Sequence, residues 1–253
     1  MEIAVIGARG SVGRVCMEEI RTQGHNSIGL TRNEDVPANI DGVIVASPIE
    51  SRDFNIPLVD CSGELSNTQL VLPNILDSNA RRRRIPNCMA SLISQALAPL
   101  HKKCTIKSII ATCLQSVSGA GWRGVQALEQ KQTEELFSGQ LVNNILPHEN
   151  AAHEEQEIRN DIKEIFGCDI TATSFRVPVV LGHLASLRVE TKNPIDECLL
   201  PCSDNFDPCT MVNKREVAIG RVRVQKNTAD LVVCGDQLLC GTAIPAVSSI
   251  LCA

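Results

Sequence analysis

The fold of this 253-residue chain is predicted from RIPNCMASLISQALAPL, residues 84–100. Pro86 pushes the residue before it toward extended geometry, so no helix is expected ahead of it. Beyond Cys88 the apolar residues recur at helical spacing, at Leu92, Ile93, Ala96, Leu97 and Leu100. Cys88 is therefore expected where an extended segment turns into a helix.

This position has a chemical consequence for Cys88. The unpaired N–H groups and positive dipole end of a helix favour a thiolate over a thiol. The sequence thus predicts a nucleophile with a lowered pKa. A free cysteine is more often a small buried apolar residue, and the spacing alone leaves both interpretations open.

Composition argues against a nucleic-acid binder. The net charge is −5, the isoelectric point is near 5.6, and aromatic residues make up 2% of the chain with no tyrosine. Basic surfaces and stacking platforms for single strands are therefore not expected. The one basic run, Arg81–Arg84, is interpreted as a solvated loop, with a phosphate or partner patch as the alternative.

The twelve cysteines are interpreted as free thiols in a reducing cytoplasm. We expect no signal peptide, because the chain opens directly into a strand, and no apolar run is long enough to cross a membrane. Cys198, Cys202 and Cys209 share a polar stretch, but their spacing matches no paired zinc pattern. No metal site is expected.

The chain begins with a pattern typical of dinucleotide binding. Glu2–Ile6 reads as an apolar strand, GARGSVG at residues 7–13 as a glycine-rich turn, and the residues to about Gln23 as a helix. Glycines let the backbone approach a pyrophosphate, and the helix N-terminus supplies N–H donors. A tight strand-to-helix turn without a ligand is the alternative.

The end of the second strand bears on cofactor choice. Ser27–Thr31 reads as that strand and is followed by Arg32. An arginine here accommodates the 2′-phosphate of NADP, whereas an acidic residue bonds the ribose of NAD. Arg32 thus favours NADP, and Asp35 three residues later weakens this preference.

Three further short apolar runs predict more parallel strands: Gly42–Ala46, Pro57–Asp60 and Gln69–Leu72. Their connections are too short for crossover helices, so the nucleotide-binding half is expected to be abbreviated.

The second half reads as a mixed sheet with helices. Strands are predicted at Ile106–Thr112, Thr171–Val180, Ala185–Thr191, Glu216–Val224 and Asp230–Cys234, and helices at 124–133, His153–Phe166 and Gly241–Leu251. The sequence therefore predicts an α/β protein of two domains, with the last helix returning to the first.

At this point the chain resembles the aspartate-semialdehyde dehydrogenase family over nearly its whole length. The similar motifs are GARGSVG (7–13), PNC (86–88), QSVSGAG (115–121), NILPH (144–148), RVPV (176–179) with GH (182–183), and GDQL (235–238). The resemblance implies an abbreviated Rossmann-like NADP-binding domain, residues 1–87 plus 236–253. It also implies an α+β catalytic and dimerisation domain of the glyceraldehyde-3-phosphate-dehydrogenase type, residues 88–235.

The resemblance also implies the reaction. The family reduces β-aspartyl phosphate to aspartate β-semialdehyde with NADPH, in lysine, methionine and threonine biosynthesis, as homodimers or homotetramers. Cys88 would form a thioester, His183 would act as general acid/base, and Gln115 would orient the reacting group. Arg176, Asn87 and Glu154 would bind substrate. The cofactor would be bound by Gly7, Arg9, Gly10, Ser11, Val12, Gly13, Arg32, Ser118 and Gly119.

Two departures concern the substrate phosphate. The family has an arginine after the strand ending near Asp60, but Cys61–Ser66 contains none. The family also has a lysine three residues after the glutamate that matches Glu154, where this chain has Glu157. Arg159, Lys163 or the Arg81–Arg84 run would have to substitute, or phosphate is not handled in the usual way.

Two alternatives therefore stay open. One is a non-catalytic relative that acts as a binding or assembly partner, favoured by the short nucleotide domain and the missing cations. The other is a related acyl-phosphate reductase, such as the N-acetyl-glutamyl-phosphate enzyme, whose family places glycine at the position of Asn87.

Overall fold

A parallel sheet of six strands organises the first part of the computed structural model, which describes residues 1–49, 54–202 and 206–252. The strand order is β2-β1-β3-β4-β6-β5. The strands are β1 (Glu2–Ile6), β2 (Asn26–Leu30), β3 (Gly42–Val45), β4 (Leu58–Asp60), β5 (Gln69–Leu70) and β6 (Arg82–Arg84). Every pair among them is parallel. The predicted parallel sheet is confirmed.

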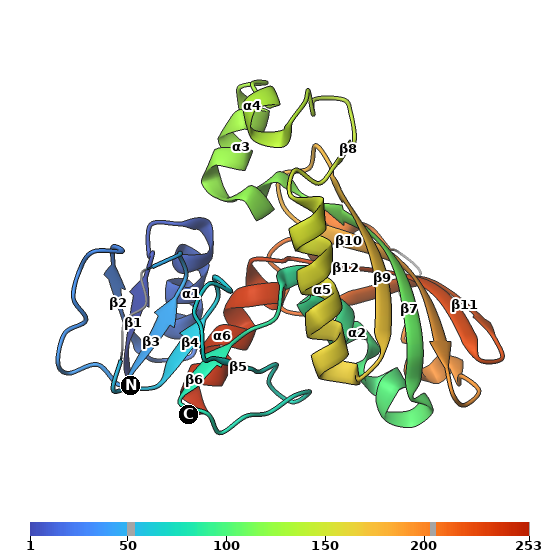
Figure 1. Ribbon diagram of the computed structural model, residues 1–253, viewed down its shortest axis with the longest axis horizontal. Helices are drawn as coiled ribbons and strands as arrows, with labels where there is room; N and C mark the ends of the chain where they lie inside the picture. Colours follow the sequence, from blue (N-terminus) through green and yellow to red (C-terminus); the bar gives the residue numbers. More distant parts are fainter. Residues whose placement is uncertain (50–53, 203–205, 253) are drawn as a thin grey trace. The chain divides into compact units, whose positions relative to one another are not determined.

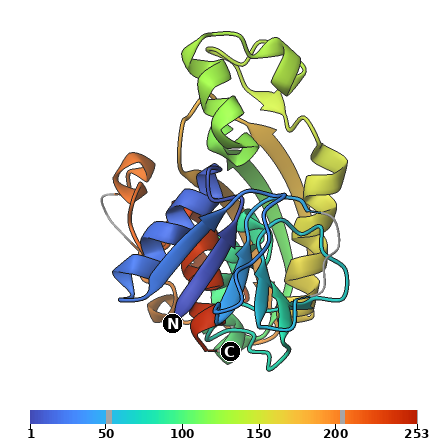
Figure 2. The ribbon, with the colours of Figure 1, turned by 90° about the vertical axis from the view of Figure 1, so that its left-hand side faces the viewer.

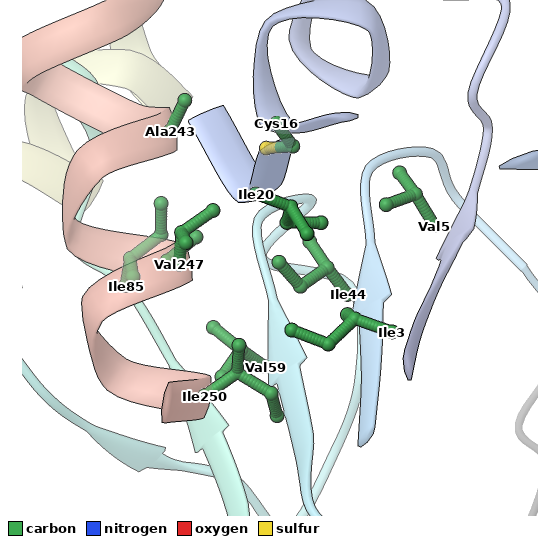
Figure 3. Packing of buried hydrophobic residues seen from close by; sticks show 11 residues of the cluster. Ile3, Val5, Cys16, Ile20, Ile44, Val59, Ile85, Ala243, Val247 and Ile250 are labelled. Atoms are coloured by element: carbon green, nitrogen blue, oxygen red, sulfur yellow. The ribbon is translucent and has the colours of Figure 1, made fainter. Parts of the chain in front are cut away.

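Helices cover one face of this sheet and connecting segments cover the other. α1 (Ser11–Thr22) and α6 (Ile244–Leu251) contact each other and lie on the same face (Figure 2). Their apolar residues pack with Ile3, Val5, Ile44 and Val59 of the strands (Figure 3). The alternate strand residues, such as Ala4 and Val43, pack instead against loop residues including Ile40 and Leu65. The described residues between β2 and β6 contain no crossover helix, as the short connections predicted.

The prediction of a solvated loop at Arg81–Arg84 is wrong, because residues 82–84 form β6 between β4 and β5. Successive side chains of a strand point to opposite faces of the sheet, and Arg83 points to the buried face, where it is 5% exposed. Arg83 Nε donates to the Ala80 carbonyl at 2.7 Å, and Nη1 donates to the Ser249 carbonyl. Ser249 lies in the last turn of α6, where carbonyls lack intrahelical partners. Arg83 therefore donates to a carbonyl at the end of α6 and is not available to bind a ligand.

A mixed six-stranded sheet organises the second part, residues 88–240, in the order β11-β12-β10-β7-β9-β8. Its strands are β7 (Ile106–Gln115), β8 (Leu146–Pro147), β9 (Asp169–Arg176), β10 (His183–Thr191), β11 (Ala218–Gln225) and β12 (Thr228–Gly235). β7 and β9 are parallel, and the other neighbours are antiparallel. α2 (Cys88–Cys104) and α5 (Ala151–Phe166) contact each other and lie on one face of the sheet (Figure 1). The predicted mixed sheet is confirmed.

Short helical segments complete this part. They are η1 (Val117–Ala120), α3 (Gly121–Glu129), α4 (Glu134–Phe137), η2 (Glu197–Leu199), η3 (Pro208–Met211) and the π-helical turn η4 (Leu239–Ala243). The helix predicted to reach Thr133 ends at Glu129, because Lys131 adopts a left-handed φ of 58°. The strand predicted to reach Val180 ends at Arg176, just before Pro178, which has no N–H for a ladder.

The chain divides into two units, residues 1–87 with the segment from 241 onward, and residues 88–240. The division into compact units falls at residue 241, whereas the sequence predicted a domain boundary at residue 236. Asp236 accepts the Asn213 N–H at 2.9 Å, and the Cys240 carbonyl accepts from Gln95 Nε2 at 2.8 Å. These bonds hold residues 236–240 within the second unit.

We expect Arg83→Met to lower the free energy of unfolding by about 2 kcal/mol, since it leaves buried carbonyl oxygens without their charged donor. Arg81→Met, at an exposed position just before β6, is the control and should change it by less than about 0.5 kcal/mol. Urea unfolding of the full chain measures both values. Equal stability of the two variants would contradict a structural role for Arg83.

Candidate active site

The strand pairing explains how residues distant in the sequence meet at one edge of the mixed sheet. Gln115 ends β7 and is paired with Arg176, which ends the parallel strand β9. His183 begins β10, which runs antiparallel to β7, with Leu184 opposite Leu114. Parallel strands end at the same sheet edge, and an antiparallel neighbour begins there. Gln115, Arg176 and His183 therefore lie together.

Arg176 is the largest buried side chain of this edge, at 2% exposure. Its Nε donates to Glu149 Oε2 at 3.1 Å, and its Nη2 donates to Glu149 Oε1 at 2.6 Å. Nη1 donates to the Ser116 carbonyl at 2.6 Å, and Nη2 also lies 2.6 Å from His148 Nε2. The guanidinium is thus paired with a carboxylate of the chain itself.

His183 is fully buried and neutral. Its Nδ1 accepts the Ser116 backbone N–H at 3.2 Å and lies 3.1 Å from Ser116 Oγ. An imidazole that accepts at Nδ1 carries its proton on Nε2. This Nε2 is buried without a hydrogen-bond partner. Burial, followed by the charge of Arg176, lowers the pKa of His183 from its ordinary value of 6.5 to about 3. The side chain therefore presents an unused N–H donor.

A chain of hydrogen bonds holds Ser116 beside His183. Ser116 Oγ lies 3.2 Å from Ser118 Oγ, which accepts from Gln237 Nε2 at 2.6 Å. Gln237 Oε1 in turn accepts the Gly182 N–H at 3.0 Å. Gly182 precedes His183, so the network returns to the imidazole that it orients.

The prediction of a thiolate at Cys88 is wrong for the ligand-free protein. Burial is the largest cause that raises the pKa of this thiol, and the negative charge of Glu154 is the second. Arg176 and the Met89 N–H at the start of α2 lower it by less. The helix N-terminus thus acts in the predicted direction, but desolvation and a neighbouring carboxylate outweigh it.

Glu154 connects the thiol to the sheet edge. It lies in the first turn of α5 and accepts from Gln115 Nε2 at 2.7 Å. The charges of both Glu154 and Arg176 act on Cys88, and Arg176 also acts on His183. Cys88, Gln115, Glu154, Arg176 and His183 therefore form one electrostatically connected cluster within the second unit.

Gly119 lies beside this cluster, in η1. A Cβ atom added there would lie 2.8 Å from Arg176 Nη1 and 3.5 Å from His183 Nε2. A larger residue would therefore displace the guanidinium or the imidazole. Ser118 is 5% exposed and takes part in the Gln237 network. Their contact with a nicotinamide stays a prediction.

The glycine-rich turn of the first unit has two glycines fixed by packing. Gly7 has a φ of 85°, and an added Cβ would lie 2.6 Å from Ser47 Cβ. An added Cβ at Gly13 would lie 2.3 Å from the Gly7 carbonyl. At Gly10 it would meet only that same oxygen, at 3.3 Å. Gly10 is the N-cap of α1, and no side chain caps the helix.

This geometry fits a bound phosphate, because the first-turn N–H groups of Ser11, Val12 and Gly13 have no intrahelical acceptor. Arg9 and Arg32 are exposed at the two loops that follow β1 and β2. A carboxylate also stands after β2, since Glu34 accepts the Thr31 N–H at 2.5 Å. Asn87 is half-buried at the end of the first unit, directly before Cys88.

In the part of the chain that the structure describes, three of the candidate cations for a substrate phosphate have other contacts or positions. Lys163 lies 3.5 Å from Asp169, and it is nine residues, or about 14 Å of helix, beyond Glu154. Arg159 is exposed on the same helix, and Arg83 is bound to main-chain carbonyls. After β4, Asp60 accepts from the backbone N–H groups of Ser62 and Leu65. The described candidates for this role therefore have other contacts or lie far along α5 from Glu154.

The sequence interpretation missed several members of the cluster: Ser116, His148, Glu149 and Gln237. Ser116, His148 and Gln237 stood in motifs that carried no assigned role. Glu149 directly follows one of these motifs, but nothing in its spacing indicates that it pairs with a residue 27 positions later. That partner becomes apparent only when β8 and β9 are placed side by side.

Comparisons with known proteins now identify the family. A family model described as "Semialdehyde dehydrogenase, dimerisation domain" matches residues 97–240, more than half of the chain. The chain belongs to the semialdehyde dehydrogenase family. The resemblance that the motifs indicated is therefore confirmed, and the matched domain indicates an oligomer.

Curated relatives of this chain are named aspartate-semialdehyde dehydrogenase. The one from Rickettsia bellii is 26% identical over 76% of this chain and 66% of its own length. The one from Prochlorococcus marinus is 28% identical over 64% of this chain and 58% of its own. The one from Synechocystis sp. is 29% identical over 70% of this chain and 65% of its own length. The chain thus spans about two thirds or less of these relatives.

Solved structures establish the fold of the chain. Aspartate semialdehyde dehydrogenase II from Vibrio cholerae, complexed with ASA, superposes with a TM-score of 0.84 at 20% identity, covering 99% of this chain and 98% of that one. A probable aspartate-semialdehyde dehydrogenase from Pseudomonas aeruginosa superposes with a TM-score of 0.84 at 18% identity, covering 98% of this chain and 97% of that one. The predicted combination of a Rossmann-like sheet and a mixed sheet is confirmed.

No metal cluster of three or more His, Cys, Asp or Glu side chains occurs among residues 1–49, 54–202 and 206–252. Within the same ranges, every helix is too short or too polar to span a membrane. All twelve cysteines are free thiols.

The buried imidazole predicts a pH dependence of stability. Below about pH 6.5 the unfolded chain protonates His183, whereas the folded protein does so only near pH 3. The unfolded state then binds more protons, so this contribution to stability is complete above pH 6.5 and is lost as the pH falls. From pH 7 to pH 5 the loss is about 2 kcal/mol. Denaturant unfolding should show a correspondingly smaller drop in His183→Gln, and an equal drop would contradict a neutral imidazole.

The charge of Glu154 predicts the reactivity of Cys88. In Glu154→Gln the pKa of the thiol falls, and each unit of that fall raises the thiolate fraction about tenfold. Alkylation of Cys88 by iodoacetamide should therefore be faster than in the wild type at the same pH, as followed by peptide mass spectrometry. Glu164→Gln, on the exposed far half of α5, is the control and should leave the rate unchanged. A slower reaction in Glu154→Gln would exclude the assigned influence.

Proposed function

We propose that this chain is an NADP-dependent aspartate-semialdehyde dehydrogenase. It would convert β-aspartyl phosphate to aspartate β-semialdehyde and phosphate through a thioester on Cys88, a step of lysine, methionine and threonine biosynthesis. The observation that carries the proposal is the cluster at the edge of the mixed sheet, where Gln115, Arg176 and His183 meet the charge environment of Cys88. The names of the relatives support the substrate.

The first step is acyl transfer. Cys88 Sγ attacks the acyl carbon, the bond from that carbon to the phosphate oxygen breaks, and phosphate leaves with the electron pair. The thiol is protonated in the free protein because burial and, second, the charge of Glu154 raise its pKa. A substrate ammonium group beside Glu154 would offset this negative charge and favour the thiolate. Substrate binding would therefore activate the nucleophile.

The second step is reduction of the thioester. Bound NADPH supplies the hydride that this carbon receives. His183 Nε2–H is the donor for the oxygen that gains negative charge, because Ser116 holds Nδ1 as an acceptor. Breaking the C–S bond, with its electron pair leaving on sulfur, then releases the aldehyde and regenerates the Cys88 thiolate. Arg176 would bind the substrate carboxylate, and the Asn87 amide is a second candidate oxyanion donor.

The residues that would hold the cofactor phosphates are the uncapped first turn of α1, Ser11 to Gly13, and Gly10 directly before it. Arg32 would meet the 2′-phosphate of NADP. The matched dimerisation domain supports a homodimer or homotetramer, and the free cysteines support a cytoplasmic location.

A non-catalytic relative that acts as a binding or assembly partner is the second candidate. It is favoured by the raised pKa of Cys88 and by the carboxylate already bound to Arg176. Binding of NADPH without turnover would support it.

The test is phosphate-dependent reduction of NADP with aspartate semialdehyde, followed by NADPH absorbance. We expect turnover in the wild type and a loss of about a thousandfold or more in Cys88→Ala, because the covalent step is removed. Cys104→Ala, at the opposite end of α2, is the matched control and should keep the activity. No turnover in the wild type, or equal turnover in Cys88→Ala, would contradict the proposed reaction.

A further inference from the structure

Glu149 occupies the face of Arg176 on which a planar anion would bind. The two parallel bonds, Nε to Oε2 at 3.1 Å and Nη2 to Oε1 at 2.6 Å, are the bidentate geometry that guanidinium adopts with carboxylates. The other Nη2 hydrogen faces His148, and one Nη1 hydrogen is donated to the Ser116 carbonyl. These contacts use four of the five guanidinium hydrogens, so no bidentate site is left for a second carboxylate.

Because Arg176 is buried, the ligand-free protein needs the Arg176–Glu149 ion pair for its stability. Arg176 is 2% exposed, and a buried cation without an anion is strongly destabilising. Burial by itself raises the pKa of Glu149, but the hydrogen bonds and charge of Arg176 outweigh it and hold the pKa below its ordinary value. Glu149 is therefore ionised and neutralises the guanidinium.

The position of Glu149 allows its side chain to move away from Arg176. It stands in the connection His148–Asn150 between β8 and α5, and its side chain is 19% exposed, compared with 2% for Arg176. A rotation of the Glu149 side chain toward solvent would free both Nε and Nη2 without moving a strand. Glu149 is thus the removable member of the pair.

We propose that Glu149 is a specificity-determining residue, an internal carboxylate that a substrate carboxylate must displace from Arg176. This inference rests on the proposed function, in which Arg176 binds the substrate carboxylate. The exchange replaces one carboxylate by another on the same fork, so it lowers the affinity for carboxylate-bearing ligands. Ligands of the same size without a carboxylate cannot replace Glu149 on Arg176, so this exchange does not change their affinity.

Glu155 provides a matched control. It is the same residue type, half-buried on the first turns of α5, and its carboxylate accepts the Ser174 backbone N–H at 2.9 Å instead of binding Arg176. Glu155→Gln therefore removes a nearby negative charge but leaves the Arg176 fork occupied.

The experiment compares two stable probes by isothermal titration calorimetry on the full chain: L-2-aminobutyrate, which carries the carboxylate, and its amide, which does not. In Glu149→Gln the acid should bind at least about tenfold more tightly than in the wild type, because an internal charged competitor is removed. The amide should bind equally to both proteins, and Glu155→Gln should behave like the wild type.

Glu149→Asp covers the case in which the glutamine variant does not fold. It keeps the charge but is one methylene shorter, so its weaker hold on the fork should give an intermediate affinity. Unchanged binding of the acid, no measurable binding to the variants, or equal tightening of the amide would overturn the inference. The readout needs no turnover, so an inactive chain with tightened binding would contradict the proposed reaction alone. An active chain with unchanged binding would contradict only the role of Glu149.

Discussion

The buried guanidinium of Arg176 is the constraint on which the candidate active site depends. A positive charge at 2% exposure must be neutralised and must have its N–H groups satisfied. Glu149, His148 and the Ser116 carbonyl meet this requirement, and Ser116 then fixes the tautomer of His183. The same charge acts on Cys88 through space. One residue at the end of β9 thereby couples the loop before α5, the turn after β7, and the start of α2.

Local signals in the sequence predicted the elements but not all of their partners. Pro86 and the apolar spacing after Cys88 predicted where α2 begins, and the structure confirms it. β6 was missed because three consecutive arginines have no strand-like pattern, and only pairing with both β4 and β5 makes Arg83 an interior residue. Its acceptor is more than 160 residues away in the chain, beyond any local signal.

In the candidate site, too, the sequence predicted some features and missed others. Cys88, Gln115, Arg176 and His183 were predicted from motifs, and the strand register brings the last three to one sheet edge. The protonation state of Cys88 was predicted wrongly, because a helix N-terminus is visible in a sequence whereas desolvation and the approach of Glu154 are not. Motif similarity therefore identified the residue types, and tertiary packing determined their charge states.

The return of α6 to the first unit has a consequence for how the chain acquires its structure. Ala243, Ala246, Val247 and Ile250 fill the core beneath β1, β3 and β4, yet they are synthesised after the entire second unit. On the ribosome, the part of this sheet face that α6 covers stays exposed, with α1 alone packed on the face, while more than 150 further residues emerge. Vectorial synthesis thus favours completion of the second unit first, and leaves the first to close in a late, long-range docking step.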